Sequence, residues 1–243
     1  MSLDIERLKN DADYYGAFGK QFLSNSDIGN LLKNPRDFKK SLPDSPTFAK
    51  GRYFHQLILE PEKIDDWLIC DSGSRNTKMY KEFCAENGIE IALLSKEVEE
   101  IESWANTMMS NMSFFDEIRR EGVEYEVPAI KEVMGLMWKG KADIVHPEMV
   151  IDLKTTSSID DFKWNARKYN YDSQAWLYNQ FFGKPMVFYV VDKNSKMLGV
   201  FDCSDNFLES GKMKVEKAVE VYHKFYGDNP TDDIDSFFIN ECL

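Results

Sequence analysis

The pattern of apolar and polar residues divides the chain into a helical first part and a strand-rich second part. Up to about residue 112, apolar residues recur at the three- and four-residue spacing of amphipathic helices, whereas the later segments alternate with a period of two. In the first part, the pattern predicts helices over residues 24–32, 47–59, 76–87 and 95–112, and strand-like runs over 67–70 and 89–94. Ser24 or Ser26 is the predicted N-cap of the first of these helices.

The second part predicts a sheet with helices packed against it. Strands are predicted over residues 123–130, 136–145, 149–154, 186–192 and 197–202, and helices over 159–168, 171–182 and 206–226. We therefore expect an α/β (α+β) fold in which a central mixed sheet is flanked by helices. The 243 residues are expected to form a single domain, with a mostly helical part at 1–112, a core at 113–227 and an acidic tail at 228–243.

The composition is typical of a folded protein that does not cross a membrane. Apolar residues make up 43% of the chain and include 17 Phe, 11 Tyr and 5 Trp, which is ample for a hydrophobic core. The apolar runs are too short to span a bilayer and the first residues do not resemble a secretory signal, so we expect a cytoplasmic protein. The cysteines are widely spaced and argue against a zinc knuckle or a disulfide framework: Cys70, Cys84, Cys203 and Cys242.

Two carboxylates and a lysine fall on two neighbouring predicted strands. Asp143 lies near the end of the strand at 136–145, and Asp152 and Lys154 lie on the strand that follows a short turn. Because strand side chains alternate in direction, Asp152 and Lys154 share a face while Leu153 points into apolar packing, and a tight hairpin can bring Asp143 alongside. Metal-assisted phosphodiester hydrolysis needs these groups: carboxylates hold a hard cation that polarises the phosphate, and a lysine positions or deprotonates the attacking water.

This arrangement resembles the core of PD-(D/E)XK nucleases, with Asp143 as the first acidic residue and Asp152-Leu153-Lys154 as the (D/E)XK element. A pattern this short also arises by chance, and its residues are then ordinary surface charges on an exposed hairpin. The resemblance implies that Asp143 and Asp152 bind a metal ion, that Leu153 offers its backbone carbonyl, and that Lys154 acts on the water. The expected ion is Mg²⁺ or Mn²⁺.

Glu126 and His55 are further candidate metal ligands. Glu126 lies on the strand before Asp143 and Glu124 shares its face; we favour Glu126, although both glutamates also fit a solvated strand face. His55 lies on a mainly apolar predicted helix. A lone histidine there is more often a hydrogen-bonded core residue, but neutral imidazole is also a good ligand for Mn²⁺.

Gln174 and Tyr178 are spaced four residues apart on the helix that follows Lys154, so they face the same way. They are candidates for orienting a phosphate or the lysine. Packing of that helix on the sheet explains equally well why an aromatic residue stands at position 178, but it does not explain the polar Gln174.

Several motifs together resemble a narrower family, the RecE-type exonucleases of phage recombination, which are related in fold to lambda exonuclease. The motifs occur in that family's order over about two-thirds of the chain: Phe22-Leu23-Ser24-Asn25-Ser26-Asp27-Ile28 with Asn34-Pro35 and Phe38, Gly51…His55-x-x-x-x-Glu60-Pro61, Lys139-Gly140-Lys141-Ala142-Asp143, Ile151-Asp152-Leu153-Lys154-Thr155-Thr156, and Tyr171-x-x-Gln174-x-x-x-Tyr178. The resemblance implies degradation of linear double-stranded DNA from a 5′ end, which leaves a 3′ single strand for a partner annealing protein. It implies catalytic or metal-binding roles for Asp143, Asp152, Lys154, His55, Glu126, Gln174 and Tyr178.

The charge of the chain fits this chemistry less well. A formal net charge of −12 is unfavourable for gripping a nucleic-acid backbone. Lys141 also stands where many relatives carry Arg, which keeps the charge but loses a two-pronged phosphate contact. A homo-oligomeric ring, a trimer or tetramer as in the family, would concentrate positive potential in a central channel. Basic residues do gather in the middle third of the chain: Lys131, Lys139, Lys141, Lys154, Lys163, Arg167 and Lys168.

The leading hypothesis is a Mg²⁺- or Mn²⁺-dependent exonuclease that hydrolyses double-stranded DNA with free ends, 5′ to 3′, in a bacterial or phage-infected cell. One alternative is an endonuclease or a single-strand nuclease on the same fold. Another is a non-catalytic DNA-binding accessory of recombination. Closed circular DNA distinguishes an exonuclease from an endonuclease, because an exonuclease does not digest DNA without ends. Thermal stabilisation of the protein by Mn²⁺ distinguishes a nuclease with a metal site from an accessory that binds no metal.

Overall fold

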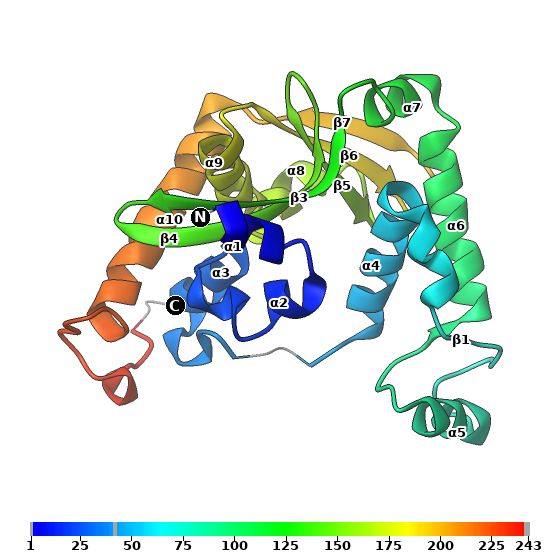
Figure 1. Cartoon of the computed structure of the whole chain (residues 1–243), viewed down its shortest axis with the longest axis horizontal. Coiled ribbons are helices and arrows are strands. Elements are labelled where there is room, and N and C mark those ends of the chain that lie inside the picture. The colour runs from blue at the N-terminus through cyan, green and yellow to red at the C-terminus, as the bar shows by residue number, and fades with distance from the viewer. Residues whose placement is uncertain (1, 41–42, 241–243) are drawn as a thin grey trace.

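The computed structural model describes residues 2–40 and 43–240, and it confirms the expected mixed α/β architecture (Figure 1). The first part contains α1 (Ser2–Arg7), α2 (Asp11–Tyr15), α3 (Asn25–Lys33), α4 (Pro46–Leu59), α5 (Lys78–Asn87), α6 (Ser95–Met109), α7 (Met112–Ile118) and the short strands β1 (Ile69–Cys70) and β2 (Leu93–Leu94). The second part contains β3 (Glu124–Val133), β4 (Leu136–Val145), β5 (Val150–Thr156), α8 (Phe162–Lys168), α9 (Tyr171–Phe182), β6 (Met186–Asp192), β7 (Leu198–Asp202) and α10 (Asp205–Phe225).

The central sheet has five strands in the order β3-β4-β5-β6-β7. β5 and β6 run parallel and are connected through α8 and α9, whereas the other neighbouring pairs are antiparallel. The mixed sheet expected from the sequence is therefore confirmed. In Figure 1, α6 lies to the right of the sheet and α10 to its left.

The sheet is covered on both faces, and the alternation along β5 decides which residues face which layer. Ile151 and Leu153 pack with α4, α6 and α7 on one side. Val150 packs with α3, α9 and α10 on the other side. Because side chains alternate along a strand, Asp152 and Lys154 face the α9 side. The apolar residues of β5 thus anchor a strand whose polar residues point into the interior.

Local signals in the sequence explain where several elements begin and end. Ser24 is the residue before α3, and Asp27 accepts a hydrogen bond from the Ser24 backbone N–H at 2.8 Å, which completes a capping box. Gly88 ends α5 in the left-handed conformation, with φ 63°, where glycine carries no Cβ penalty. Of the two N-caps that the sequence left open, Ser24 and Ser26, the structure has Ser24.

The prediction of a single helix over residues 95–112 is wrong at its C-terminal end. α6 ends at Met109, and a separate helix, α7, begins after Asn111. The Asn111 side chain accepts a hydrogen bond from the Phe114 backbone N–H at 3.2 Å, so it caps the new helix. Apolar residues on both sides of this break kept the helical pattern continuous in the sequence.

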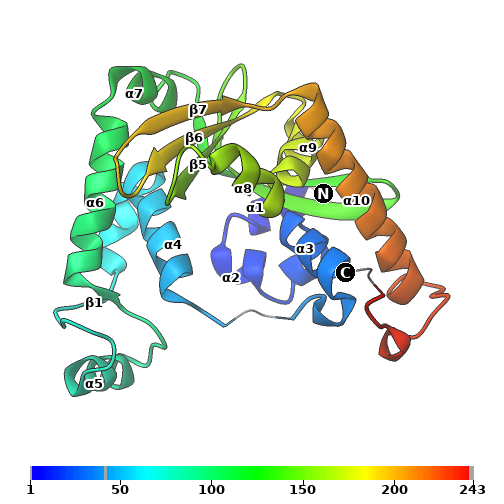
Figure 2. The same cartoon turned by 180° about the vertical axis from the view of Figure 1, so that it is seen from behind.

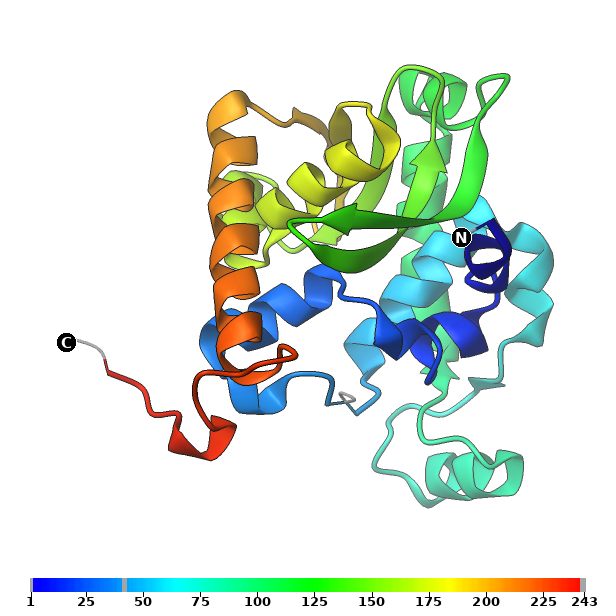
Figure 3. The ribbon, with the colours of Figure 1, turned by 60° about the vertical axis from the view of Figure 1, so that its left-hand side comes forward.

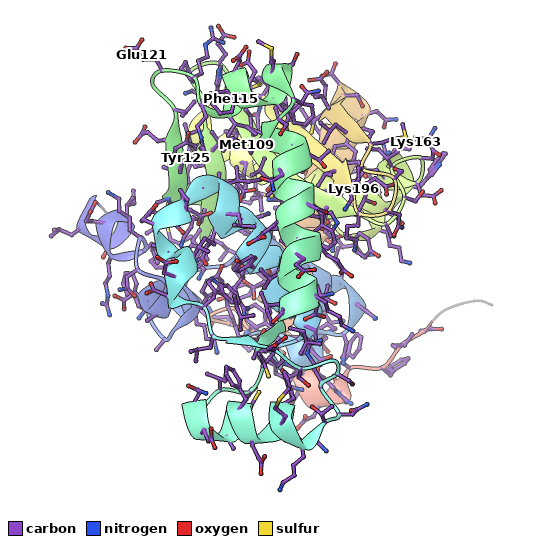
Figure 4. All side chains as sticks on the ribbon, turned by 90° about the vertical axis from the view of Figure 1, so that its right-hand side faces the viewer. Met109, Phe115, Glu121, Tyr125, Lys163 and Lys196 are labelled. Carbon is purple, nitrogen blue, oxygen red and sulfur yellow. The ribbon has the colours of Figure 1, made fainter. Side chains whose placement is uncertain are left out.

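The strand-like runs expected over 67–70 and 89–94 are mostly not strands. Only two residues of each form the parallel pair β1–β2, which carries the protruding helix α5 at the bottom of Figure 4. Cys70, Cys84 and Cys203 are free thiols, and Cys242 lies outside the described residues. Within those residues, no helix is long and apolar enough to cross a membrane.

Candidate active site

The candidate residues come from five elements that meet where β3 and β4 bend. In Figure 3, the long β3–β4 hairpin curves across the front of the molecule. Regular pairing of the two strands is interrupted where Glu126 stands opposite Asp143. Ala142 packs on the α9 side of the sheet, whereas Ile144 packs on the α4 side, so the side chains of β4 change faces here. This bend lets carboxylates from two strands point to the same place.

Glu126 has an unusual backbone conformation at the bend. Its φ is 51°, in the left-handed region, which costs a residue with a side chain about 1–2 kcal/mol. Such local strain is found where surrounding structure holds a residue in place for function. Glu124, the alternative considered from the sequence, is exposed. The geometry therefore favours Glu126 as the candidate ligand.

His55, from α4, connects β4 with β5. Its Nε2 lies 2.9 Å from the backbone oxygen of Leu153, and its Nδ1 lies 3.6 Å from Oδ1 of Asp143. The other oxygen of Asp143 accepts a hydrogen bond from the Leu153 backbone N–H at 2.7 Å. One ligand atom each from His55, Glu126 and Asp143 lies within 4.8 Å of the others. Three side chains that are far apart in the sequence thus form a compact group able to hold one cation.

Asp152 and Lys154 form a buried ion pair beside that group. Asp152 is 2% exposed, and its Oδ1 accepts a hydrogen bond from Nε2 of Gln174 at 2.6 Å. Its Oδ2 contacts the Lys154 ammonium group but accepts no hydrogen bond of regular geometry from any residue that the structure describes. The ammonium nitrogen lies 4.8 Å from the centre of the Tyr171 ring, a cation–π distance.

The pKa values reflect an excess of negative charge in the buried site. Burial, with a contribution from Asp143, raises the pKa of Glu126 to about 8. Burial also raises the pKa of Asp152, with Lys154 opposing and Asp143 adding to the shift. For Lys154, burial favours the neutral form, but Asp152 more than offsets it and the pKa lies above its usual value. The carboxylates of Glu126, Asp143 and Asp152 thus lie near the ammonium groups of Lys141 and Lys154, and a further cation would relieve the remaining repulsion between the carboxylates.

The residues present fit a divalent cation. Carboxylate oxygens are ligands of Mg²⁺, and one imidazole among them extends the choice to Mn²⁺. Oδ2 of buried Asp152 contacts the Lys154 ammonium group but accepts no hydrogen bond of regular geometry from the described residues, so it can accept a further contact from an ion or water. Asp152, which was also expected as a metal ligand, is not in the compact group of three, and its carboxylate contacts Gln174 and Lys154. The carbonyl of Leu153, also expected as a ligand, faces His55.

Gln174 and Tyr178 share a face of α9, as expected, but they contact different parts of the site. Gln174 bonds Asp152 rather than Lys154. The Tyr178 hydroxyl donates to the Lys141 carbonyl at 2.8 Å and accepts from the Lys141 backbone N–H at 3.1 Å. Tyr178 therefore fixes the backbone of β4 two residues before Asp143. Each of these two residues positions a carboxylate-bearing strand.

The N-terminal residues complete the surroundings of the site, and sequence reasoning missed them. Lys141 Nζ lies 2.5 Å from Oδ1 of Asp11 and 3.8 Å from Oε2 of Glu126. Lys139 lies over the ring of Tyr14 at 3.9 Å and donates a hydrogen bond to the Tyr14 carbonyl. Asp11 and Tyr14 are more than 120 residues from these lysines, and no local pattern signals such a contact.

A cavity of about 390 Å³ opens beside Gln174. The residues that line it include Ser24, Ser26, Lys139 and Tyr169. The Ser-x-Ser motif noted in the sequence therefore lies next to the candidate catalytic residues. Hydroxyl, amide and ammonium groups can donate to an anionic substrate group, but Ser24, Lys139 and Gln174 already donate to Asp27, the Tyr14 carbonyl and Asp152.

The fold and the site together define a PD-(D/E)XK-type domain. More narrowly, the chain belongs to the family described as "PDDEXK-like domain of unknown function (DUF3799)", whose model matches residues 24–229. A crystal structure from Eubacterium rectale, of a protein described as "Putative exonuclease", is similar over 96% of this chain and 95% of its own, with a TM-score of 0.64 and 16% identity. At that identity the likeness shows the fold.

A second solved structure, described as SSO0001, covers 68% of this chain and 85% of its own, with a TM-score of 0.33 and 15% identity. That score is too low to support an argument. No curated protein matches the chain.

Proposed function

We propose that the protein is a metal-dependent deoxyribonuclease. The observation that carries this proposal is the buried Asp152–Lys154 pair, held by Gln174, directly beside the compact group of His55, Glu126 and Asp143. Phosphodiester hydrolysis needs a cation site and a positively charged group near the attacking water, and this arrangement supplies both.

The ligands would be Asp143, Glu126 and His55, with Asp152 and the Leu153 carbonyl as the further groups expected from the sequence. A bound Mg²⁺ or Mn²⁺ supplies a Lewis acid that polarises the phosphate and lowers the pKa of a coordinated water. Lys154, whose ammonium group contacts Asp152, would orient the water and stabilise negative charge that develops on the phosphate.

The surrounding residues keep this geometry fixed. Gln174 holds one oxygen of Asp152, and the Tyr171 ring limits the positions open to the Lys154 ammonium group. Tyr178 holds the β4 backbone before Asp143. Second-layer contacts of this kind decide whether ligands stay within the narrow tolerances that catalysis needs.

The finer proposal is a RecE-like exonuclease that degrades linear double-stranded DNA, 5′ to 3′, in a bacterial or phage-infected cell. It is supported by the order of the motifs between Leu23 and Tyr178 and by the fold shared with a protein described as a "Putative exonuclease". An annealing protein as partner and a ring-shaped homo-oligomer belong to the same proposal.

The test is digestion of 5′-phosphorylated linear duplex DNA beside closed circular DNA, in Mg²⁺, Mn²⁺ or EDTA. The variant is Lys154→Ala, and the matched control is Lys212→Ala on the exposed face of α10. Metal-dependent loss of the linear form by the wild type and the control, but not by Lys154→Ala, is expected. Loss of the circular form would instead favour an endonuclease, and normal cutting by Lys154→Ala would refute the assigned site.

A DNA-binding accessory without catalysis is the second candidate, although the net charge of −12 counts against it as it does against the nuclease. Thermal unfolding in Mn²⁺ separates the two, because a ligand that binds only the native state raises the melting temperature. An accessory would bind DNA, show no stabilisation by Mn²⁺ and leave linear DNA intact.

A further inference from the structure

Helix α8 and the turn after it carry exposed aromatic rings interleaved with positive charges. Trp164 is 67% exposed and Tyr169 is 56% exposed. The Lys163 ammonium nitrogen lies 5.1 Å from the centre of the Trp164 ring, and that of Lys168 lies 5.9 Å from the Tyr169 ring. These lysines belong to the basic group noted in the sequence, and the proposed chemistry leaves them without a role.

The core does not require either exposed ring. Phe162 and Ala166, four residues apart on α8, are buried against the α9 side of the sheet and anchor the helix. Trp164 points away from that anchored face. A tryptophan in water forgoes the burial that normally stabilises it, so its exposure here suggests a surface that makes contact with something else.

One of the two exposed rings, that of Tyr169, leads inward to the candidate catalytic lysine. The Tyr169 ring lies 6.0 Å from the Tyr171 ring, and the Tyr171 ring lies 4.8 Å from the Lys154 ammonium nitrogen. Tyr169 also lines the cavity beside Gln174. Figure 2 shows α8 on the near side of the molecule, next to β5, the strand that carries Lys154. A strand that contacts Tyr169 would therefore lie next to the candidate active site.

Charge indicates what kind of chain this surface would accept. Asp160 and Asp161 lie before α8, whereas Lys163, Arg167 and Lys168 are on the helix itself. Cations that alternate with stacking rings match a strand whose phosphates and unstacked bases are both accessible. Paired bases in a duplex do not expose their faces to side chains in this way.

We propose that α8 and its following turn bind an unpaired DNA strand, with Trp164 and Tyr169 stacking on bases and Lys163 and Lys168 contacting phosphates. The inference rests on the proposed nuclease function and specifies it: the duplex is opened next to the cut site, and one separated strand is held on this surface.

Binding is measured by the fluorescence anisotropy of a labelled oligothymidylate in EDTA, so that cleavage does not interfere. Trp164→Ala and Tyr169→Ala are each expected to weaken binding about 5- to 150-fold, the loss associated with removal of one stacked base. Trp164→Phe should restore most of the affinity, because it keeps an aromatic face. Phe115→Ala on α7 is the matched control, since Phe115 is 45% exposed and lies apart from Lys163 in Figure 4.

Intrinsic tryptophan fluorescence gives an independent measure of the same contact. Stacking of a base on Trp164 should quench its emission in the wild type, and the quenching should disappear in Trp164→Phe although binding persists. Unchanged affinity of Trp164→Ala and Tyr169→Ala, or no oligothymidylate binding by the wild type, overturns the proposal.

Digestion of linear DNA in Mn²⁺ separates this inference from the proposed function. A wild type that cuts DNA, with variants that bind like the wild type, refutes the stacking surface and leaves the nuclease intact. A wild type that cuts nothing, with affinity lost in Trp164→Ala, refutes the nuclease and supports the surface.

Discussion

Replacement of Gln174 by Met tests how the buried carboxylate of Asp152 is held. The Gln174 side chain donates to Oδ1 of Asp152 at 2.6 Å, and the substitution would leave that carboxylate with Lys154 as its contact. Hydrogen bonds to charged groups contribute about 1.5–3 kcal/mol, and Met fills nearly the same volume, so no cavity term is added. We expect the free energy of unfolding to fall by about 2 kcal/mol, or about 4–8 °C in melting temperature for a chain of this length.

The same substitution should weaken metal binding. The bond from Gln174 favours the ionised form of Asp152, whose pKa burial already raises, and its loss raises that pKa further. Loss of a partner that orients a metal ligand typically reduces affinity 10- to 100-fold. Urea unfolding in EDTA measures the stability change, and calorimetric titration with Mn²⁺ measures the affinity.

Gln180→Met is the matched control, because Gln180 lies on the same helix and its side chain contacts Asn179 at 3.5 Å. It should change stability by less than about 0.5 kcal/mol and leave the Mn²⁺ affinity unchanged. If Gln174→Met unfolds like the wild type and binds Mn²⁺ equally well, the role assigned to Gln174 is wrong.

Three further predictions address the strand, the N-terminal contact and the metal site. A Cβ on Gly140 would lie 2.7 and 2.9 Å from two aromatic rings of α9, so Gly140→Ala should destabilise by about 1–3 kcal/mol. A Cβ on Gly51 in α4 would meet no described atom within 4 Å, so Gly51→Ala should stabilise the protein by about 0.5–1 kcal/mol. If the two glycine variants shift the melting temperature in the same direction, this contrast is wrong. Burial lowers the pKa of Lys139 to about 8 from the usual 10.5. Between those values the unfolded chain holds a proton that the folded protein has released, so stability rises with pH. Urea unfolding between pH 8 and 10.5 should show a smaller rise in the free energy of unfolding for Lys139→Met than for the wild type. An equal rise in both proteins would refute the lowered pKa of Lys139. Finally, His55→Ala should reduce the thermal stabilisation that Mn²⁺ gives the wild type, and full retention of it would exclude His55 as a ligand.

The sequence predicts the elements best where the packing environment is uniform along a segment. β4, α9 and β6 begin and end where the pattern places them, because their apolar residues repeat regularly and turn residues flank them. The break between α6 and α7 depends on one capping bond from Asn111, which periodicity does not register. The division of the chain into residues 1–112, 113–227 and 228–243 stays a prediction.

The site is predictable in its residue types more than in its contacts. The spacing of Asp143, Asp152 and Lys154 indicates carboxylates and an ammonium group on paired strands, and the structure brings them together. The contact between Asp11 and Lys141 arises only when the chain folds over 130 residues of separation. Which oxygen of Asp152 bonds Gln174 is likewise set by the packing of α9 on the sheet.

The left-handed backbone of Glu126 has a consequence for how this protein would respond to selection in the laboratory. Asparagine adopts that conformation more readily than glutamate, so Glu126→Asn relieves part of a penalty of about 1–2 kcal/mol. It also removes a carboxyl group whose charged form is disfavoured by burial. A screen for thermal tolerance alone should therefore enrich Asn at this position, while a screen for cutting should retain Glu. Opposite outcomes of the two screens at one codon would show that stability has been given up there for chemistry.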